Sequence, residues 1–286
     1  MKSSLELLRP PHTRYDVNLS PTRKKGRLVN IVVCVKQVVD TEAEKRLDPD
    51  SWRLDRSVDS VLNPYDEYAV EEALLLKEAN EGEVTVLCMG PEEADEAIRK
   101  ALAMGADSAV LVSDAALAGS DVQGTAYALA EALRTLQFDV VVFGSRSTDS
   151  ETGCVPAAVA ELLGLPLLSS LAKVEANGSA LTVRRETEAG YVAYECPLPA
   201  VVSVIKGINE PRYPTMKGIL GAKRKSVDVK DAAALSLDAS RIGLSGAKAR
   251  VIGARVAEAR KAGVKIEDDG DGAKRLADFL ASEKLV

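Results

Sequence analysis

The stretch DVVVFGSRSTDSETGCVPAAVAE, residues 139–161, decides the interpretation of the whole chain. Its apolar run at 140–143 predicts a buried strand, Gly144 a turn, and residues 145–151 a loop of small and polar side chains. A helix is expected from about Thr152. The first N–H groups of a helix lack intrahelical partners and lie at the positive end of its dipole, so this order of elements can bind an anion such as the phosphate of an adenine nucleotide.

A second interpretation of these residues is purely structural. Ser150 or Thr152 could cap the helix, and Glu151 would be favourable in its first turn. Two carboxylates, Asp149 and Glu151, would also repel a phosphate unless a cation or backbone donors outweigh them. From these residues alone, a helix cap and a ligand site are equally good explanations.

Apolar runs and helical patterns alternate before this stretch. Strands are expected at 28–35, 84–89 and 109–112. One helix is expected to begin at Asn63, a second to begin at Gly90, and a third to span 121–136. Asn63 suits the cap of the first helix, Pro64 its first position and Asp66 its first turn. This alternation predicts an α/β fold with one parallel, Rossmann-like sheet covered on both faces.

The pattern changes after Gly164. Alternating segments at 172–175, 181–186 and 191–195, with Asn177-Gly178 between the first two, predict an antiparallel extension, and 200–205 predicts another buried strand. Three parts are expected: a disordered N-terminal extension at 1–29, a nucleotide-binding α/β domain at 30–225, and a C-terminal arm at 226–286. The arm has little continuous apolar sequence and one clear helix at 272–285, so we expect it to wrap a partner.

Composition excludes several functions. The 286-residue chain has a net charge of −6 and only 4% aromatic residues, which gives no electrostatic attraction to DNA or lipid and no stacking surface for single-stranded nucleic acid. No apolar run is long enough to cross a bilayer, and the leader lacks the apolar segment of a secretory signal. We therefore expect neither nucleic-acid binding nor direct membrane insertion.

The reactive residues favour a binding or carrier role over hydrolysis. The four cysteines are far apart, and the single histidine, His12, lies in the Pro-rich leader, so a zinc cage or a disulfide framework is not expected. Unpaired cysteines suit a reducing, cytoplasmic location. The sequence contains no Gly-x-Gly-x-x-Gly or Walker A motif and no evident nucleophile–base pair. A stand-alone nucleotide-binding enzyme is the less favoured alternative.

Several blocks of sequence together resemble the β subunit of electron transfer flavoproteins. They are VCVKQVVDT at 33–41, LNPYDEYAVEEAL at 62–74, ALAMGADSAVLV at 101–112, the opening stretch with AELLGLP at 160–166, and LPAVVSVIKGINEPRYPTMKGILGAKRK at 198–225. The resemblance covers nearly all of 28–225, and NEPRYPTMKGI is its most specific part.

The resemblance implies an adenine nucleotide alpha hydrolase-like fold and an αβ heterodimer that carries FAD. Such a dimer passes electrons from flavoprotein dehydrogenases to a quinone oxidoreductase or another acceptor. The redox flavin belongs mainly to the α subunit, and the β subunit of the simple type holds AMP. In electron-bifurcating members the same β pocket holds a second FAD that takes hydride from NADH.

Carried over by position, the resemblance also implies a set of cofactor-binding residues. The adenine would meet backbone at Cys34, Asn63, Pro64, Tyr65, Asp66 and Met89. The phosphate would lie on Gly144, Ser145, Asp149, Glu151, Thr152, Gly153, Cys154 and Val155. Relatives read close to DGDTAQVGP where this chain reads DSETGCVPA. Cys154 replaces a common glutamine and Pro156 removes an N–H, so AMP and a second FAD both stay open.

The segment at 214–220 resembles the loop through which the family recognises its partner dehydrogenases. Pro214, Thr215, Met216 and Ile219 would be partner contacts within a recognition loop near 209–220. Met216 stands where the family has an anchoring leucine. A flexible thioether can fill an apolar pocket equally well, and its Pro- and Lys-flanked setting favours exposure.

Overall fold

The computed structural model describes residues 29–255, 263 and 265–286. The predicted extension at 1–29, with His12, therefore lies outside the described residues apart from Val29. The chain divides into two compact units, Met1–Val251 and Ile252–Val286, which are described separately.

The first unit is built on a sheet whose strands follow the order β11-β5-β4-β1-β6-β10-β7-β8-β9. From β11 to β7 every neighbouring pair is parallel, and β8 and β9 continue the sheet in antiparallel fashion. The strands are β1 (Asn30–Val35), β4 (Glu83–Met89), β5 (Ser108–Val112), β6 (Val140–Gly144), β7 (Leu167–Asn177), β8 (Ala180–Thr187), β9 (Gly190–Pro197), β10 (Ala200–Val204) and β11 (Val227–Lys230). The predicted parallel α/β fold with an antiparallel extension is confirmed.

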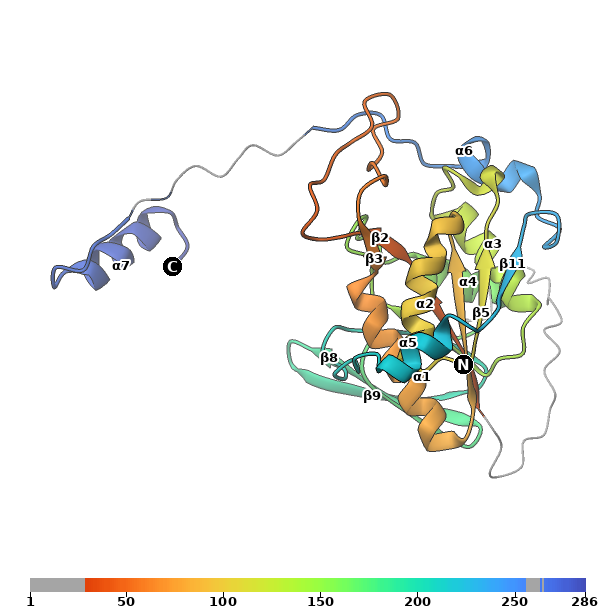
Figure 1. The fold of residues 1–286 in the computed structure, drawn as a ribbon. Helices are drawn as coiled ribbons and strands as arrows, with labels where there is room; N and C mark the ends of the chain where they lie inside the picture. Colours follow the sequence, from red (N-terminus) through yellow and green to blue (C-terminus); the bar gives the residue numbers. More distant parts are fainter. Residues whose placement is uncertain (1–28, 256–262, 264) are drawn as a thin grey trace, which may run out of the picture. The chain divides into compact units, whose positions relative to one another are not determined.

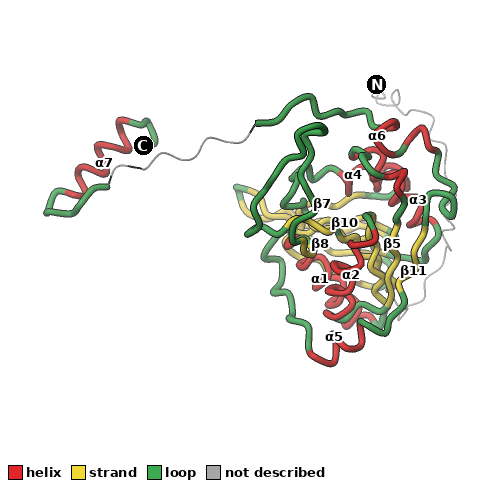
Figure 2. Tube along the Cα trace, turned by 45° about the horizontal axis from the view of Figure 1, so that its top comes forward, coloured by secondary structure: helices red, strands yellow, loops and turns green. Residues whose placement is uncertain are grey.

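Helices cover both faces of this sheet, as Figure 2 shows. Helices α1 (Pro64–Asn80), α2 (Asp95–Met104) and α5 (Met216–Ala222) pack on one face, while α3 (Val122–Arg134) and α4 (Val155–Leu163) pack on the other. Strand β1 explains this arrangement, because its side chains alternate between the two cores: Ile31 and Val33 join the first, and Val32 and Cys34 the second. A strand buried on both faces must be apolar at almost every position.

Two short strands form a separate antiparallel sheet beside the main one. Strand β2 (Gln37–Val39) pairs with β3 (Ser60–Leu62), and the chain between them makes an excursion of its own. The remaining short elements are the 3-10 turns η1 (Glu92–Ala94), η2 (Ala115–Leu117) and η3 (Ala239–Arg241) and the single-turn helix α6 (Gly243–Gly246).

Helix α4 begins at Val155, three residues later than the expected start at Thr152. The reason is the backbone before it. Glu151 has φ +50° and Gly153 has φ +61°, and residues in this left-handed region cannot belong to a right-handed helix.

Residues 226–251 belong to the first compact unit. Strand β11 pairs in parallel with β5, and Leu235 and Ile242 are buried in the core beneath α3. The predicted boundary at residue 226 therefore differs from the boundary of the compact unit, which falls after Val251.

The second unit, Ile252–Val286, contains α7 (Gly272–Ser282), close to the helix expected at 272–285. Leu276 and Phe279 are one helical turn apart and both exposed, which leaves an apolar stripe on this helix. None of the helices in the described ranges combines the length and the apolar character needed to cross a membrane.

Candidate functional site

The carboxyl ends of the central strands form the candidate site. The chain runs outward from β1 to β4 and β5 and then returns to β6 on the other side of β1, so the strand order reverses between β1 and β6. Register pairs Cys34 with Phe143 across β1 and β6. Lys36 and Gly144 therefore leave the sheet next to each other, and open α/β sheets bind ligands at such a reversal.

Asn63 holds the loop that follows β6. It occupies the N-cap position of α1, but its side chain makes no capping hydrogen bond there. Instead, Asn63 Nδ2 donates to the carbonyl of Arg146 at 2.9 Å, and the N–H of Thr148 donates to Asn63 Oδ1 at 3.2 Å. The side-chain cap expected from sequence is therefore wrong, because the buried amide binds the loop at 146–148.

Asp66 links α1 to both strands of the site. It is buried and accepts a 2.8 Å hydrogen bond from the backbone N–H of Lys36. Burial raises the pKa of Asp66 to about 7, although the hydrogen bond from Lys36 opposes the shift. Gly144 lies against the same carboxylate, since a Cβ at this position would stand 2.4 Å from Asp66 Oδ1. Only glycine allows this close approach of β6 to α1.

The titration of Asp66 predicts a pH-dependent stability. An unfolded aspartate has a pKa of about 4, so the folded protein binds more protons than the unfolded chain up to about pH 7. The free energy of unfolding is therefore expected to fall as pH rises from about 5 to about 7, by up to about 1.4 kcal/mol per pH unit from this group. Urea unfolding at several pH values measures it, and Asp66→Asn is expected to give a shallower slope.

Asp114→Asn is the matched control for this prediction. Backbone N–H groups of Ala116 and Ala232 lower the pKa of Asp114, so Asp114 titrates below the pH range of about 5 to about 7 in which Asp66 acts. The slope of this control is expected to match that of the unchanged protein. An equally steep slope in Asp66→Asn would show that another group is responsible.

Asp149 is the ionic centre of the loop. Its side chain is 1% exposed, and it pairs with Lys36 through a 2.8 Å contact between Nζ and Oδ1 and with Arg56 Nη2 through Oδ2. Burial alone would raise the pKa of Asp149, but the two cations outweigh it and hold this pKa well below its usual range. Two positive charges thus face one buried carboxylate, which removes the repulsion that Asp149 would exert on an anion.

The N-terminus of α4 is open. No side chain caps it: the thiol of Cys154, at the cap position, instead lies 3.1 Å from the carbonyl of Thr152. The predicted caps, Ser150 and Thr152, do not reach the helix, and Thr148 Oγ1 is buried in the same loop without a partner among the described residues. An uncapped helix of nine residues beside neutralised Asp149 fits a phosphate group, although Pro156 leaves it one donor fewer.

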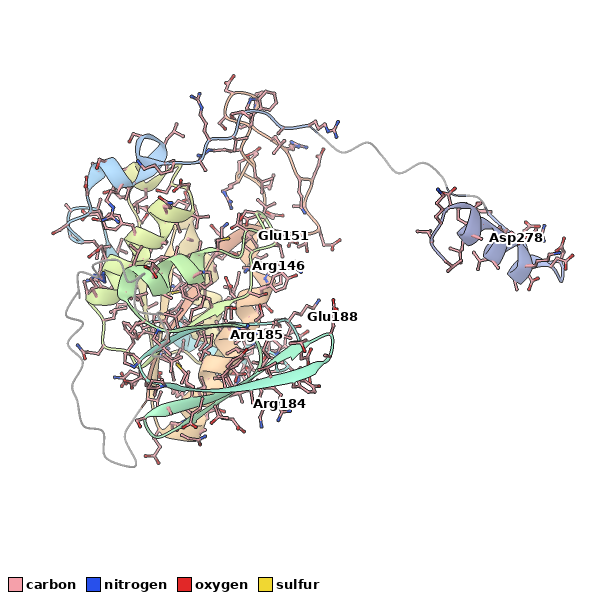
Figure 3. All side chains as sticks on the ribbon, turned by 180° about the vertical axis from the view of Figure 1, so that it is seen from behind. Arg146, Glu151, Arg184, Arg185, Glu188 and Asp278 are labelled. Atoms are coloured by element: carbon pink, nitrogen blue, oxygen red, sulfur yellow. The ribbon has the colours of Figure 1, made fainter. Side chains whose placement is uncertain are left out.

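Arg146 adds a further cation at the outer side of the loop. Its guanidinium lies 5.1 Å from the ring centre of Tyr65, and Nε donates to Tyr65 Oη at 3.1 Å. This hydrogen bond and the charge of Glu151 raise the pKa of Arg146. In the view of Figure 3, Arg146 and Glu151 lie close to each other, above the β8–β9 hairpin that carries Arg184 and Arg185.

The structure therefore brings the predicted cofactor residues to one edge of the sheet. Cys34 and Met89 lie in or at the end of neighbouring strands, 63–66 start α1, and 144–155 make the loop and open α4. Sequence reasoning missed the cations Lys36, Arg56 and Arg146. Lys36 follows the first strand directly and could have been found from that position.

The loop at 209–220 lies apart from this edge, beside α1 and α2. Arg212 binds Glu71 of α1 through Nε at 2.8 Å and Nη2 at 2.9 Å, and Asn209 Nδ2 donates to Glu72 at 2.9 Å. Thr215 caps α5 by accepting from the N–H of Gly218 at 3.0 Å. The loop is thus fixed by polar contacts while its apolar side chains point outward.

Met216 begins α5 and is 72% exposed, which agrees with the exposure favoured by its setting. Leu220, on the same helix, and Tyr213, just before it, are also exposed. Gly218 lets the helix approach α2, because a Cβ there would stand 2.4 Å from the carbonyl oxygen of Ala103. The result is an apolar patch on a firmly held, seven-residue helix.

The fold and this edge define an α/β protein of the Rossmann-like class with a candidate ligand site at the strand reversal. Residues 51–235 match the electron transfer flavoprotein domain. The chain is 45% identical to the electron transfer flavoprotein subunit beta of Mycobacterium tuberculosis (strain ATCC 25618 / H37Rv), over 91% of this chain and 100% of the relative.

Two further relatives carry the same name. The protein of Megasphaera elsdenii is 38% identical over 90% of this chain and 100% of its own length. The protein of Clostridium acetobutylicum is 42% identical over 78% of this chain and 86% of its own length. The chain belongs to the β-subunit family of electron transfer flavoproteins.

Proposed function

We propose that this chain works with an α subunit as one half of an electron transfer flavoprotein. The pair carries electrons from flavoprotein dehydrogenases to a quinone oxidoreductase or another acceptor. Similarity to relatives named as β subunits, over nine tenths of the chain, carries this proposal. The FAD, held mainly by the α subunit, supplies one- and two-electron transfer when bound. Four unpaired cysteines are consistent with the proposed cytoplasmic location.

The β subunit itself is proposed to hold AMP at the β1–β6 edge. The open N-terminus of α4 and the N–H groups of 152–155 would bind the phosphate, and the left-handed conformation of Gly153 sets the direction of these groups. The backbone at Cys34, at 63–66 and at Met89 would contact the adenine. Asn63 keeps the loop in place, and Lys36 and Arg56 neutralise Asp149, so the site as a whole accepts negative charge.

Co-expression with an α subunit tests the proposal. The two chains are expected to purify together as a yellow complex with flavin absorbance. A colourless chain that purifies alone in the presence of the α subunit would contradict the proposed role. Turnover of ATP by the isolated chain would instead support the stand-alone enzyme.

Met216 is proposed to anchor the partner dehydrogenase. Removing an exposed anchor of this size typically costs a binding interface more than about 1 kcal/mol, so Met216→Ala is expected to slow reduction by the dehydrogenase about tenfold at low concentration. Cofactor content is expected to stay unchanged. Stopped-flow reduction of the complex measures the rate.

Leu244→Ala is the control for the anchor. Leu244 is 64% exposed on α6, away from the loop, so its loss is expected to leave the rate unchanged. Loss of cofactor from Met216→Ala would place Met216 in the structural framework and remove it from the interface.

A further inference from the structure

The chain between β2 and β3, residues 40–59, forms an excursion at the ligand edge; we refer to it as the 40–59 loop. Its ends are joined by the hydrogen bond from Asp40 N to Asp59 O at 2.9 Å, and a bridge pairs Leu47 with Leu54 further out. Figure 1 shows it projecting from β2 and β3 beyond the end of the sheet. It contains Trp52, the single tryptophan of the chain.

Two arginines tie the 40–59 loop to the rest of the first unit. Arg53 Nη2 donates to the carbonyl of Gly119 at 3.0 Å. Arg56 Nη2 pairs with Asp149 Oδ2, and this contact differs from the first because its acceptor is almost fully buried, with 1% of the side chain exposed. Asp149 thereby forms ion pairs with two separate segments: the end of β1, through Lys36, and the 40–59 loop, through Arg56.

We propose that Arg56 is a positioning residue for the nucleotide, which fastens the 40–59 loop to the phosphate-binding loop through Asp149. The proposal rests on the nucleotide binding proposed above. Neither the adenine nor the phosphate needs to touch Arg56 for this role.

The consequence of losing Arg56 follows from the buried carboxylate. Asp149 would keep Lys36 at Oδ1, but its buried Oδ2 would lose a charge-assisted hydrogen bond, and a buried acceptor left without a partner is unfavourable. A buried oxygen without its partner favours an outward movement of the loop at 145–153, which brings this oxygen to water. That movement would disturb the left-handed backbone of Glu151 and Gly153, which sets the direction of the N–H groups at α4. It would also free the 40–59 loop.

The test compares the αβ complex carrying Arg56→Gln, Arg56→Lys or Arg46→Gln with the unchanged complex. Arg46 lies in the same loop and pairs with its near neighbour Glu44, at the surface and not with Asp149, so Arg46→Gln is the matched control. One readout is the dissociation rate of labelled AMP. The other, which needs no nucleotide, is trypsin cleavage after Arg53, scored by mass spectrometry.

Arg56→Gln is expected to release AMP about fivefold faster and to be cut faster after Arg53, because the partly buried ion pair is lost. Arg56→Lys should be intermediate, and Arg46→Gln should match the unchanged complex. Either readout staying at its unchanged value in Arg56→Gln overturns the proposal. If the unchanged complex binds no AMP, the proposed function fails, and the cleavage rate alone decides whether Arg56 fastens the loop.

Discussion

Replacing Arg212 with alanine is expected to lower the free energy of unfolding by about 3 kcal/mol. Its partner Glu71 is 4% exposed and receives two side-chain hydrogen bonds from Arg212, so the variant leaves a carboxylate buried with only a backbone donor. Breaking a buried pair in this way typically costs about 3–5 kcal/mol. The expected loss lies at the low end of this range because the Arg212 side chain is 35% exposed, so water can partly replace it.

Urea unfolding of the αβ complex, at the same protein concentration for every variant, measures this loss of unfolding free energy. Arg224→Ala, an exposed arginine further along the same segment, is expected to change the free energy by less than about 0.5 kcal/mol. Adding Glu71→Gln to Arg212→Ala should recover part of the loss, since it removes the unpaired charge. A free energy for Arg212→Ala equal to that of the Arg224 control would show that the pair between Arg212 and Glu71 does not hold the loop at 209–220.

Gly144→Ala is expected to lower the free energy of unfolding by about 2–3 kcal/mol and to abolish the proposed nucleotide binding. The added Cβ would stand 2.4 Å from Asp66 Oδ1 and 2.8 Å from the carbonyl carbon of Tyr65. Neither atom can withdraw unless the start of α1 moves. That movement would break the hydrogen bond between Asp66 and Lys36 and displace Asn63, which holds the loop at 146–148.

Gly221→Ala is the matched control for this substitution. A Cβ at Gly221 meets no atom within 4 Å, and this helical position in α5 favours alanine, so stability is expected to stay the same or rise by up to about 1 kcal/mol. Thermal unfolding and the adenine nucleotide content of the purified complex report the two effects. If the Gly144→Ala variant keeps the thermal stability and the adenine nucleotide content of the unchanged complex, this result would contradict the close packing of β6 on α1.

The sheet was predictable because buried parallel strands are continuous apolar runs, as in β1 and β6. Strand β11 was not, because the four residues Val227–Lys230 alternate with charges and pair with β5, more than a hundred residues earlier. The start of α4 was misplaced for a different reason. Nothing in its local pattern shows that Glu151, a residue with a side chain, adopts a left-handed conformation.

The candidate site also has a part that the sequence could predict and a part that it could not. The loop proposed to bind phosphate is continuous in sequence, so residues 144–155 could be predicted together. The cations could not be paired with Asp149 from sequence, because Lys36 lies 113 and Arg56 93 residues away from it. The residue types at the start of α1 likewise assigned Asn63 to a cap, whereas its amide binds a segment more than eighty residues away.

The β1–β6 edge is proposed to hold an adenine nucleotide, and a cofactor count in the purified αβ complex tests this proposal most directly. Denatured complex would be analysed for flavin by absorbance and for AMP by chromatography. The proposal predicts one FAD and one AMP per αβ pair. Two FAD and no AMP would contradict AMP at this site and support the electron-bifurcating alternative, while one FAD and no second nucleotide would contradict the site itself.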